Sequence, residues 1–359
     1  MHEGAFQSGK SAEMNAKKTE KKDADPSTKL STKDAMLSLF EQNKGEWFSG
    51  EEIASRLDVS RTAIWKAVDS LRSEGYPIDS QKSRGYRLSP DTDIVSSQGV
   101  GKYLSQDLSL NMTVFDEVVS TNTLLKERAA DGEKEGTVII ANSQTGGKGR
   151  LGRSFFSPLD TGLYISVLLR PTDMAPQRAL RITTMAAVAA CDAIEGVLTG
   201  REKPQIKWVN DIFLRERKVV GILTEASMSM ENGNLEYAVL GIGFNVYPPE
   251  GGFPEEIRNI AGAILPERVP DAKNKIAAVF LNRFFELYRS REEKAYAAEY
   301  KKRSLVLGKK VDVIPTGSGE KRIAKVLDIT DECNLLVEYL DGKKEEAVLS
   351  SGEVSIRPK

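Results

Sequence analysis

Histidine is almost absent from this chain of 359 residues, because the only one is His2 near the N-terminus. Catalysis by a histidine base and metal binding by histidines are therefore nearly excluded. Any chemistry falls instead to Lys, Arg, Asp, Asn, hydroxyl groups and the backbone. Cysteine is also scarce: Cys191 and Cys333 lie far apart and have neither a metal-binding spacing nor a disulfide framework. Two widely separated cysteines are typical of proteins in a reducing cytosol.

The sequence also lacks long apolar runs and an excess of charge of either sign. No stretch approaches the roughly 20 apolar residues of a membrane span, and the N-terminus has no apolar core of a signal peptide. We therefore expect a cytoplasmic protein without a membrane partner. Because the net charge is −1, any contact with nucleic acid must come from a local basic patch. Length and composition fit about two or three globular domains.

The most informative segment that is present is a glycine-rich, cationic loop. Glycines and cations alternate in it, in the order Gly147, Lys148, Gly149, Arg150, Gly152 and Arg153. Glycine lets a backbone approach a ligand closely, and positive charge at the same place suits an anion such as a nucleotide phosphate. The segment fits neither the P-loop nor the GxGxxG pattern. Strands expected at 137–141 and 162–169 flank the loop, which favours a binding site over a solvated basic turn.

Hydrophobic patterning divides the chain into four parts and predicts an α+β fold. Residues 1–29 are polar and charged, which predicts a disordered tail. Residues 30–89 have helical periodicity, serine caps and a short hairpin pattern, which together describe a winged helix-turn-helix. Residues 90–303 alternate strands and helices around the main core. Residues 304–359 contain short β runs and an Asp-Gly turn signal, which indicate a small β-barrel.

Three further polar or glycine clusters lie at the ends or inside of expected strands. A β-turn explains Asn210 and Asp211 in the Lys-Trp-Val-Asn-Asp segment at 207–211, but it does not explain Lys207 at the end of a buried strand. The Ser-Thr-Asn cluster at 120–122 opens a helix, where capping alone accounts for one residue. Gly241 and Gly243 lie within a strand, so either a ligand lies on the sheet, or a bulge or a closely packed helix is present.

The N-terminal unit carries a local basic patch. Its third helix, expected at 61–74, offers on its exposed face Arg61, Thr62, Trp65, Lys66 and Arg72, and the hairpin after it adds Lys82, Arg84 and Arg87. Early residues of a recognition helix reach base edges, and a basic wing suits phosphates or the minor groove. The alternative is a small helical domain for protein contacts. The cations favour DNA, and dimerisation is expected because one such module binds weakly.

Together these motifs resemble the bacterial family of bifunctional biotin–protein ligases and biotin-operon repressors. The resemblance covers residues 30–359 and is most specific at the 147–153 loop with the Phe-Phe-Ser-Pro segment that follows it. The segments at 207–211, 221–225 and 241–245 follow in the family's order and spacing. Three positions depart from the common pattern: the family often has Arg at Lys148, Trp at Phe155 and Pro at Val209.

The resemblance implies a central mixed α/β ligase domain of the class II synthetase/biotin-ligase type and a C-terminal SH3-like β-barrel. It implies that biotin and ATP are substrates, that Mg²⁺ accompanies ATP without a metal site on the protein, and that biotin passes to a lysine of a biotin carboxyl carrier protein. Operator DNA of biotin genes is the second implied partner, with a homodimer in the adenylate-bound state.

The resemblance also implies roles for individual residues. Lys207 and Arg150 are implied as catalytic. The implied biotin-binding residues are Ser120, Thr121, Asn122, Gln144, Gly147, Lys148, Gly149, Arg150, Lys207, Gly241 and Gly243. The implied contacts to ATP and the adenylate are Lys148, Arg150, Arg153, Phe155, Lys207, Asn210 and Asn245.

Two alternative functions stay open at this point. A lipoate–protein ligase catalyses the same kind of transfer on a related fold, but lacks the cationic glycine loop in this form and does not usually carry a winged helix. A ligand-sensing repressor without catalysis would not need Lys207 or an intact loop. Measuring whether the release of pyrophosphate from ATP requires biotin distinguishes all three functions.

Overall fold

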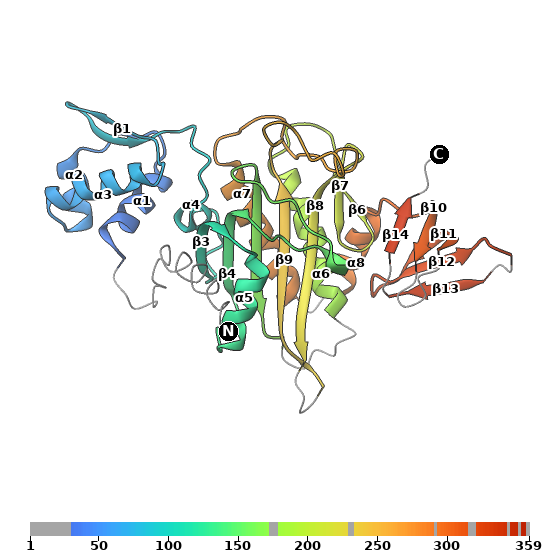
Figure 1. Cartoon of the computed structure of the whole chain (residues 1–359). Helices are drawn as coiled ribbons and strands as arrows, with labels where there is room; N and C mark the ends of the chain where they lie inside the picture. The colour runs from blue at the N-terminus through green and yellow to red at the C-terminus, as the bar shows by residue number, and fades with distance from the viewer. Residues whose placement is uncertain are drawn as a thin grey trace, which may run out of the picture.

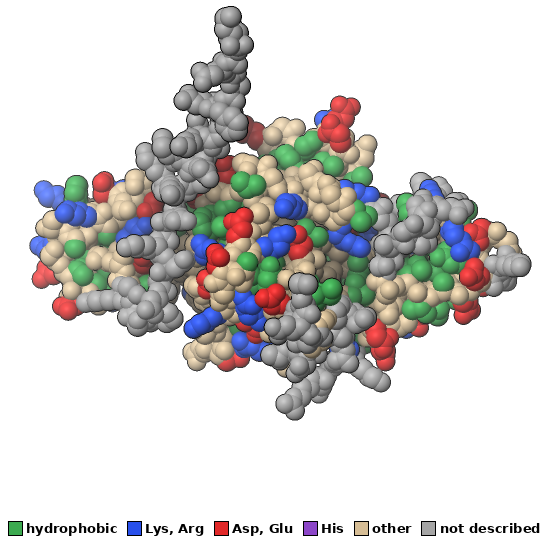
Figure 2. Space-filling model, turned by 60° about the horizontal axis from the view of Figure 1, so that its bottom comes forward, with side chains coloured by type: hydrophobic (Ala, Val, Ile, Leu, Met, Phe, Trp, Pro, Cys, Tyr) green, Lys and Arg blue, Asp and Glu red, His purple; other side chains and the backbone are tan. Residues whose placement is uncertain are grey.

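The computed structural model describes residues 30–171, 179–228, 233–290, 293–314, 321–342, 345–350 and 353–356, so the predicted disordered tail lies outside the described residues. The described elements form three groups in a row, with a small helical unit at one end, a sheet with helices in the centre and a small β-sheet at the other end (Figure 1). Acidic and basic side chains are interspersed over the visible face of the molecule (Figure 2).

The N-terminal group is a helix-turn-helix with a β-hairpin wing. Its elements are α1 (Thr32–Gln42), α2 (Gly50–Leu57), α3 (Arg61–Ser73), β1 (Ile78–Gln81) and β2 (Gly85–Leu88). Each helix follows a serine, Ser31, Ser49 or Ser60, whose hydroxyl accepts a hydrogen bond from the backbone N–H three residues later. Apolar residues at helical spacing, among them Ile64 and Val68, form a core of their own. The predicted winged helix-turn-helix is confirmed.

The central group is a mixed seven-stranded sheet. Its strands are β3 (Asn111–Val118), β4 (Thr137–Gln144), β5 (Gly162–Leu169), β6 (Gln205–Lys207), β7 (Asp211–Leu214), β8 (Arg217–Met228) and β9 (Leu235–Asn245). They lie in the order β3-β4-β5-β9-β8-β7-β6, and within it only the β3–β4 pair is parallel. The sequence predicted most of these strands but not β7, of which only the first residue, Asp211, had been assigned, to a turn.

Helices cover both faces of this sheet (Figure 1). They are α4 (Ser97–Gly101), α5 (Thr121–Ala130), α6 (Ala179–Glu195), α7 (Ala272–Arg289) and α8 (Glu293–Lys302), of which α4 and α8 were not predicted. Alternate residues of β5, such as Ile165 and Val167, face the large core that α6 and α7 close. Leu168 faces the other way and packs under Leu125 of α5. The strand is buried throughout because it has a helix layer on each side.

The C-terminal group is an antiparallel five-stranded sheet in the order β13-β12-β11-β10-β14. Its strands are β10 (Lys310–Ile314), β11 (Arg322–Ile329), β12 (Leu335–Tyr339), β13 (Glu346–Leu349) and β14 (Glu353–Ile356). Its inner residues Val311, Val326 and Val337 belong to the same hydrophobic core as the central sheet. The two sheets are therefore packed together rather than joined by a bare linker. No described helix has both the length and the apolar character needed to cross a membrane.

A buried group of charges joins the winged helix to the central part. The ammonium of Lys44 lies 3.1 Å from Glu41 and 2.8 Å from Asp271, while that of Lys102 lies 2.9 Å from Glu41 and 2.6 Å from Asp271. Burial acts to raise the pKa of Asp271, but hydrogen bonds from Lys102, Lys44 and Tyr103 outweigh burial and hold this pKa well below its usual range. The two carboxylates are almost fully buried, so the four charges depend on one another.

We predict that Asp271→Asn loosens this contact and costs about 3–5 kcal/mol, because it leaves two buried lysines with one carboxylate. The free energy of unfolding, measured by urea denaturation at neutral pH, checks the loss. Asp91→Asn is the control, since Asp91 is an exposed carboxylate in the segment between β2 and α4. A depressed pKa means that the stabilisation is present above the ordinary value of about 3.9 and is lost as the pH falls below it. The difference between variant and wild type therefore shrinks at acid pH. Equal losses in the two variants at neutral pH would contradict the role of Asp271.

Candidate active site

The candidate site lies on the face of the central sheet that points away from α6 and α7. Three strand glycines, Gly221, Gly241 and Gly243, form its floor. Gly243 of β9 pairs with Gly221 of β8 on one side and with Tyr164 of β5 on the other. Two residues before Gly243 in the same strand, Gly241 pairs with Leu223 of β8 on one side and with Ser166 of β5 on the other. The alternation of side chains along a strand puts all these positions on one face.

The strand glycines make room for two side chains of the protein. A Cβ atom on Gly241 would lie 2.1 Å from the Asn122 side-chain oxygen, and one on Gly243 would lie 2.5 Å from the Phe155 ring. A Cβ on Gly221 would meet the same ring at 2.8 Å. These contacts answer the question that the sequence left open: Asn122 and the Phe155 ring lie directly on the glycine floor.

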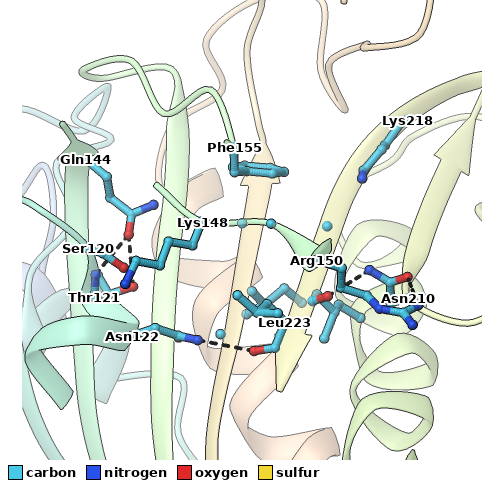
Figure 3. A pocket seen from close by; sticks show the side chains of 16 residues that line it. Ser120, Thr121, Asn122, Gln144, Lys148, Arg150, Phe155, Asn210, Lys218 and Leu223 are labelled. Carbon is cyan, nitrogen blue, oxygen red and sulfur yellow. Dashed lines mark hydrogen bonds between the residues drawn. The ribbon is translucent and has the colours of Figure 1, made fainter. Parts of the chain in front are cut away.

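A polar pocket opens above this floor (Figure 3). Its lining residues are Ser120, Thr121, Asn122, Gln144, Lys148, Gly149, Arg150, Phe155, Asn210, Lys218, Gly221, Ile222, Leu223, Gly241, Ile242 and Gly243. Most of the predicted biotin and nucleotide residues therefore meet at one place. The predicted residues outside the lining are Gly147, Arg153, Lys207 and Asn245.

Hydrogen bonds organise the corner between β4 and α5. Ser120 caps α5 by accepting from the Thr123 N–H, as its sequence position predicted. The backbone N–H and the hydroxyl of Thr121 both donate to the side-chain oxygen of Gln144, at 2.9 and 3.2 Å. The amide nitrogen of Gln144 in turn donates to the Ser157 hydroxyl at 3.0 Å. Hydrogen bonds within the protein thus fix this corner, seen at the left of Figure 3.

Asn122 is held by partners that the sequence analysis did not identify as functional. Its amide nitrogen donates to Glu225 at 2.8 Å and to the Leu223 carbonyl at 3.3 Å, and its oxygen accepts from Ser166 at 2.6 Å. Glu225 also accepts from Lys126 at 2.6 Å. Burial acts to raise the pKa of Glu225, but the bonds from Lys126 and Asn122 prevail and lower it, so the carboxylate stays charged at neutral pH. Asn122 therefore supports the corner through its own contacts.

The cationic loop is a short hairpin that reaches over the pocket. The Gly149 N–H donates to the Arg153 carbonyl at 2.7 Å, and the Phe155 N–H donates to the Gly147 carbonyl at 2.9 Å. A single 3₁₀ turn at Arg150–Gly152 forms its tip, where Leu151 is 70% exposed. A Cβ on Gly147 would lie 2.5 Å from the Phe155 carbonyl, so Gly147 is required for the hairpin itself.

Arg150 connects the loop to the far side of the pocket. Its guanidinium donates to the Asn210 side-chain oxygen at 3.1 Å, and the Asn210 nitrogen donates to the Ile222 carbonyl at 2.8 Å. Loop and sheet are thus joined across the opening (Figure 3). Arg153 lies on the exposed side of the hairpin.

Lys207 lies in the same cross-strand row as the glycine floor, at the edge of the sheet. It pairs with Asp211, which pairs with Gly221, which pairs with Gly243. Two strand spacings of ~4.8 Å separate Lys207 from Gly221. The ammonium lies 5.7 Å from the centre of the Phe213 ring. Asp211 itself forms an ion pair with Lys218 at 2.7 Å.

Several lining residues were not assigned a role from the sequence. The Gly-Ile-Leu-x-Glu segment at 221–225 was part of the resemblance but was given no role, because its position opposite Gly241 and Gly243 follows from the strand pairing. Ile242 lines the pocket between Gly241 and Gly243 and also belongs to the large hydrophobic core. Nothing in the sequence singled out Lys218, because its role depends on the pairing of β7 with β8. The described residues contain no cluster of three or more His, Cys, Asp or Glu that could hold a metal ion.

Comparisons with known proteins agree with this geometry. Residues 32–87 match a family described as HTH domain, and residues 114–245 match the Biotin/lipoate A/B protein ligase family. The structure resembles a biotin protein ligase from Aquifex aeolicus in complex with biotin and ATP, with a TM-score of 0.54 and 26% identity over 69% of this chain and 99% of that one. The class is thus a ligase fold preceded by a helix-turn-helix.

Curated relatives narrow this class further. The bifunctional ligase/repressor BirA of Bacillus subtilis is 35% identical over 233 residues, which cover 64% of this chain and 69% of the relative. BirA of Escherichia coli is 27% identical over 317 residues, which cover 87% of this chain and 94% of the relative. The chain belongs to this family of bifunctional ligase/repressors.

We predict that Gly243→Ala destabilises the protein by about 1–3 kcal/mol, because its Cβ overlaps the Phe155 ring. Replacing Phe155 by Leu in the same chain restores most of this loss, since the shorter side chain leaves the floor free. The double-mutant cycle is measured by urea denaturation. Gly101→Ala is the control, because a Cβ at Gly101 has no neighbour within 4 Å. Simple additivity of the Gly243 and Phe155 variants would show that the ring does not rest on the glycine.

Proposed function

We propose that the chain is an ATP-dependent biotin–protein ligase that also represses transcription of biotin genes. The observation that carries the proposal is the pocket in which the cationic loop reaches through Arg150 to Asn210 over a glycine floor. Family membership and the likeness to a ligase in complex with biotin and ATP support it. We assign residues 30–89 to DNA binding, 90–303 to catalysis and 304–359 to a small C-terminal domain with an SH3-like barrel.

The first step joins two anions. An oxygen of the biotin carboxylate attacks the α-phosphorus of ATP, the bond from that phosphorus to the bridging oxygen breaks, and pyrophosphate leaves. The product is biotinyl-5'-AMP. Cations that face both anions lower the barrier, because they neutralise charge where it accumulates in the transition state. The pocket offers Lys148, Arg150 and Lys218 at its wall.

We assign Lys207 to the meeting point of carboxylate and phosphate. It shares a cross-strand row with Gly221 and Gly243, and its flexible side chain reaches inward from the edge of the sheet when phosphate attracts it. The polar corner of Ser120, Thr121 and Gln144 suits the ureido group of biotin, and Phe155 suits the adenine ring. Asn210 and Asn245 contribute to nucleotide binding, Asn245 because it follows Gly243 on the same face of β9.

In the second step the amine of a lysine on the biotin carboxyl carrier protein attacks the acyl carbon of the adenylate. An amide bond forms and AMP leaves. The mixed anhydride is already activated, so the protein chiefly positions the reactants. Bound together with ATP, Mg²⁺ would compensate the charge of pyrophosphate. The pocket has cations rather than a carboxylate cluster, so the phosphates of ATP would hold the ion.

We predict that Lys207→Met lowers biotin-dependent exchange of pyrophosphate into ATP by about 10²–10³-fold, because one cation is lost from the transition state. The thermal unfolding curve stays unchanged. Lys203→Met is the control, since Lys203 lies just before β6 with its side chain 72% exposed. If lipoate instead of biotin supports exchange by the wild type, the protein is a lipoate ligase. If neither acid supports exchange, it is a non-catalytic sensor.

The winged helix supports the repressor function through its exposed cations. Arg61, Thr62, Trp65 and Lys66 are exposed along α3, and Lys82 and Arg84 are exposed in the wing. Arg72 donates to the Ile78 carbonyl at 2.8 and 3.1 Å, so it also holds the wing to α3. We infer that α3 enters the major groove of operator DNA, that two copies of the chain bind two half-sites, and that biotinyl-5'-AMP promotes this dimer. We place both activities in the cytoplasm.

We predict that Lys66→Ala weakens binding to the upstream region of biotin genes and reduces the slope of log affinity against log salt by about one. The reason is that one cation fewer displaces counterions from phosphate. Fluorescence anisotropy at several salt concentrations, with and without biotin and ATP, measures both effects. Lys134→Ala, an exposed lysine of the central part, serves as the control. Retention of the full slope by the Lys66 variant would remove α3 from the interface.

A further inference from the structure

The segment that carries Lys207 lies in β6, the last strand of the central sheet, yet its backbone is not left open. The Ile206 N–H donates to the Arg303 carbonyl at 2.8 Å, and the Leu305 N–H donates to the Ile206 carbonyl at 2.7 Å. The stretch that leads from α8 to the C-terminal sheet therefore pairs with the outer edge of β6. This pairing connects Lys207 to a part of the chain that contributes nothing to the pocket lining.

Two buried side-chain hydrogen bonds extend this connection past Lys207. The indole N–H of Trp208, which is 4% exposed, donates to the Cys333 carbonyl at 3.0 Å. Cys333 lies in the turn between β11 and β12 with a φ of 61°, a left-handed conformation that orients its carbonyl. The hydroxyl of Tyr300 on α8, which is fully buried, donates to the Val209 carbonyl at 3.1 Å.

Residues 208–210 form the turn that follows Lys207. The last residue of this turn, Asn210, is fixed from the pocket side. The Ile222 N–H donates to the Asn210 carbonyl at 3.0 Å, and the Asn210 amide donates back to the Ile222 carbonyl at 2.8 Å. Residues 208–210 are thus held between β8 on one side and the C-terminal elements on the other. Lys207 directly precedes this turn. Because a lysine side chain has many rotamers, the position of its backbone decides which of them reach the pocket.

We propose that Trp208 and Tyr300 are positioning residues for the ligase reaction, through which the C-terminal sheet and α8 set the position of Lys207. The proposal rests on the proposed function, since it assigns Lys207 a place in adenylate formation. Neither side chain touches the pocket. Loss of either hydrogen bond shifts the turn and lowers the rate of adenylate formation, while the biotin corner at the start of α5 stays intact.

The test replaces each donor by phenylalanine in the full chain. Tyr300→Phe keeps the ring and removes only the O–H donor, whereas Trp208→Phe keeps an aromatic ring but removes the N–H donor together with part of the indole volume. Biotin-dependent pyrophosphate exchange is expected to fall about 10–100-fold in kcat, since a misplacement of ~1 Å has effects of this size, with the KM for biotin unchanged. Trp47→Phe is the matched control, because the buried indole N–H of Trp47, in the winged helix, has no hydrogen-bonding partner among the described residues.

A double-mutant cycle with Lys207→Arg separates positioning from a general loss of stability. If Trp208 acts through Lys207, Trp208→Phe lowers the residual rate of the Lys207→Arg chain much less than it lowers the wild-type rate. Equal reduction in both backgrounds overturns the proposal, as does a lower melting temperature with an unchanged kcat. If either variant does not fold, the cycle with the other decides.

Failure of the proposed function is recognised separately. In that case the wild type itself shows no biotin-dependent exchange. Hydrogen exchange at the amides of 206–210 then decides whether the two donors fix the turn: faster exchange in Trp208→Phe than in Trp47→Phe supports the positioning role, and equal exchange overturns it.

Discussion

The register between β8 and β9 is the constraint on which the site depends. It places Gly221 opposite Gly243, and the Phe155 ring lies over this pair. A slip by one residue would turn Val220 and Phe244 toward the pocket and the glycines toward the core, because side chains alternate between the faces of a sheet. The large apolar residues that flank the glycines therefore define the site as much as the glycines do. Their burial against α6 and α7 fixes the register.

The arrangement of charged side chains around the pocket favours the binding of an anion. Lys148, Arg150 and Lys218 line the pocket, and the nearby carboxylates of Glu225 and Asp211 are already paired with Lys126 and Lys218. Lys218 is thus shared between Asp211 and the pocket, whereas Arg150 donates to the neutral side chain of Asn210. A chain with almost no net charge can in this way present a strongly cationic site, since only the local arrangement matters to a bound phosphate.

The sequence predicted much of this arrangement, and the failures have two causes. Periodicity and capping located the winged helix, and the alternation of Gly241 with Gly243 pointed to a close approach on the sheet. The partners that meet there, Ser166 and Glu225, come from strands distant in sequence, so only the strand order reveals them. The same holds for Lys218. The short elements β7 and α8 escaped prediction because their apolar residues are too few to establish a period.

The buried charges between α1, α4 and α7 have a consequence for how DNA is read. Since Glu41 and Asp271 hold the same two lysines, the recognition helix is fixed relative to the ligase part instead of moving on a tether. In a dimer, the distance between two recognition helices would then be set by the surface through which the ligase parts meet. A change of operator spacing would require a change at that surface, and lengthening the linker would not produce it.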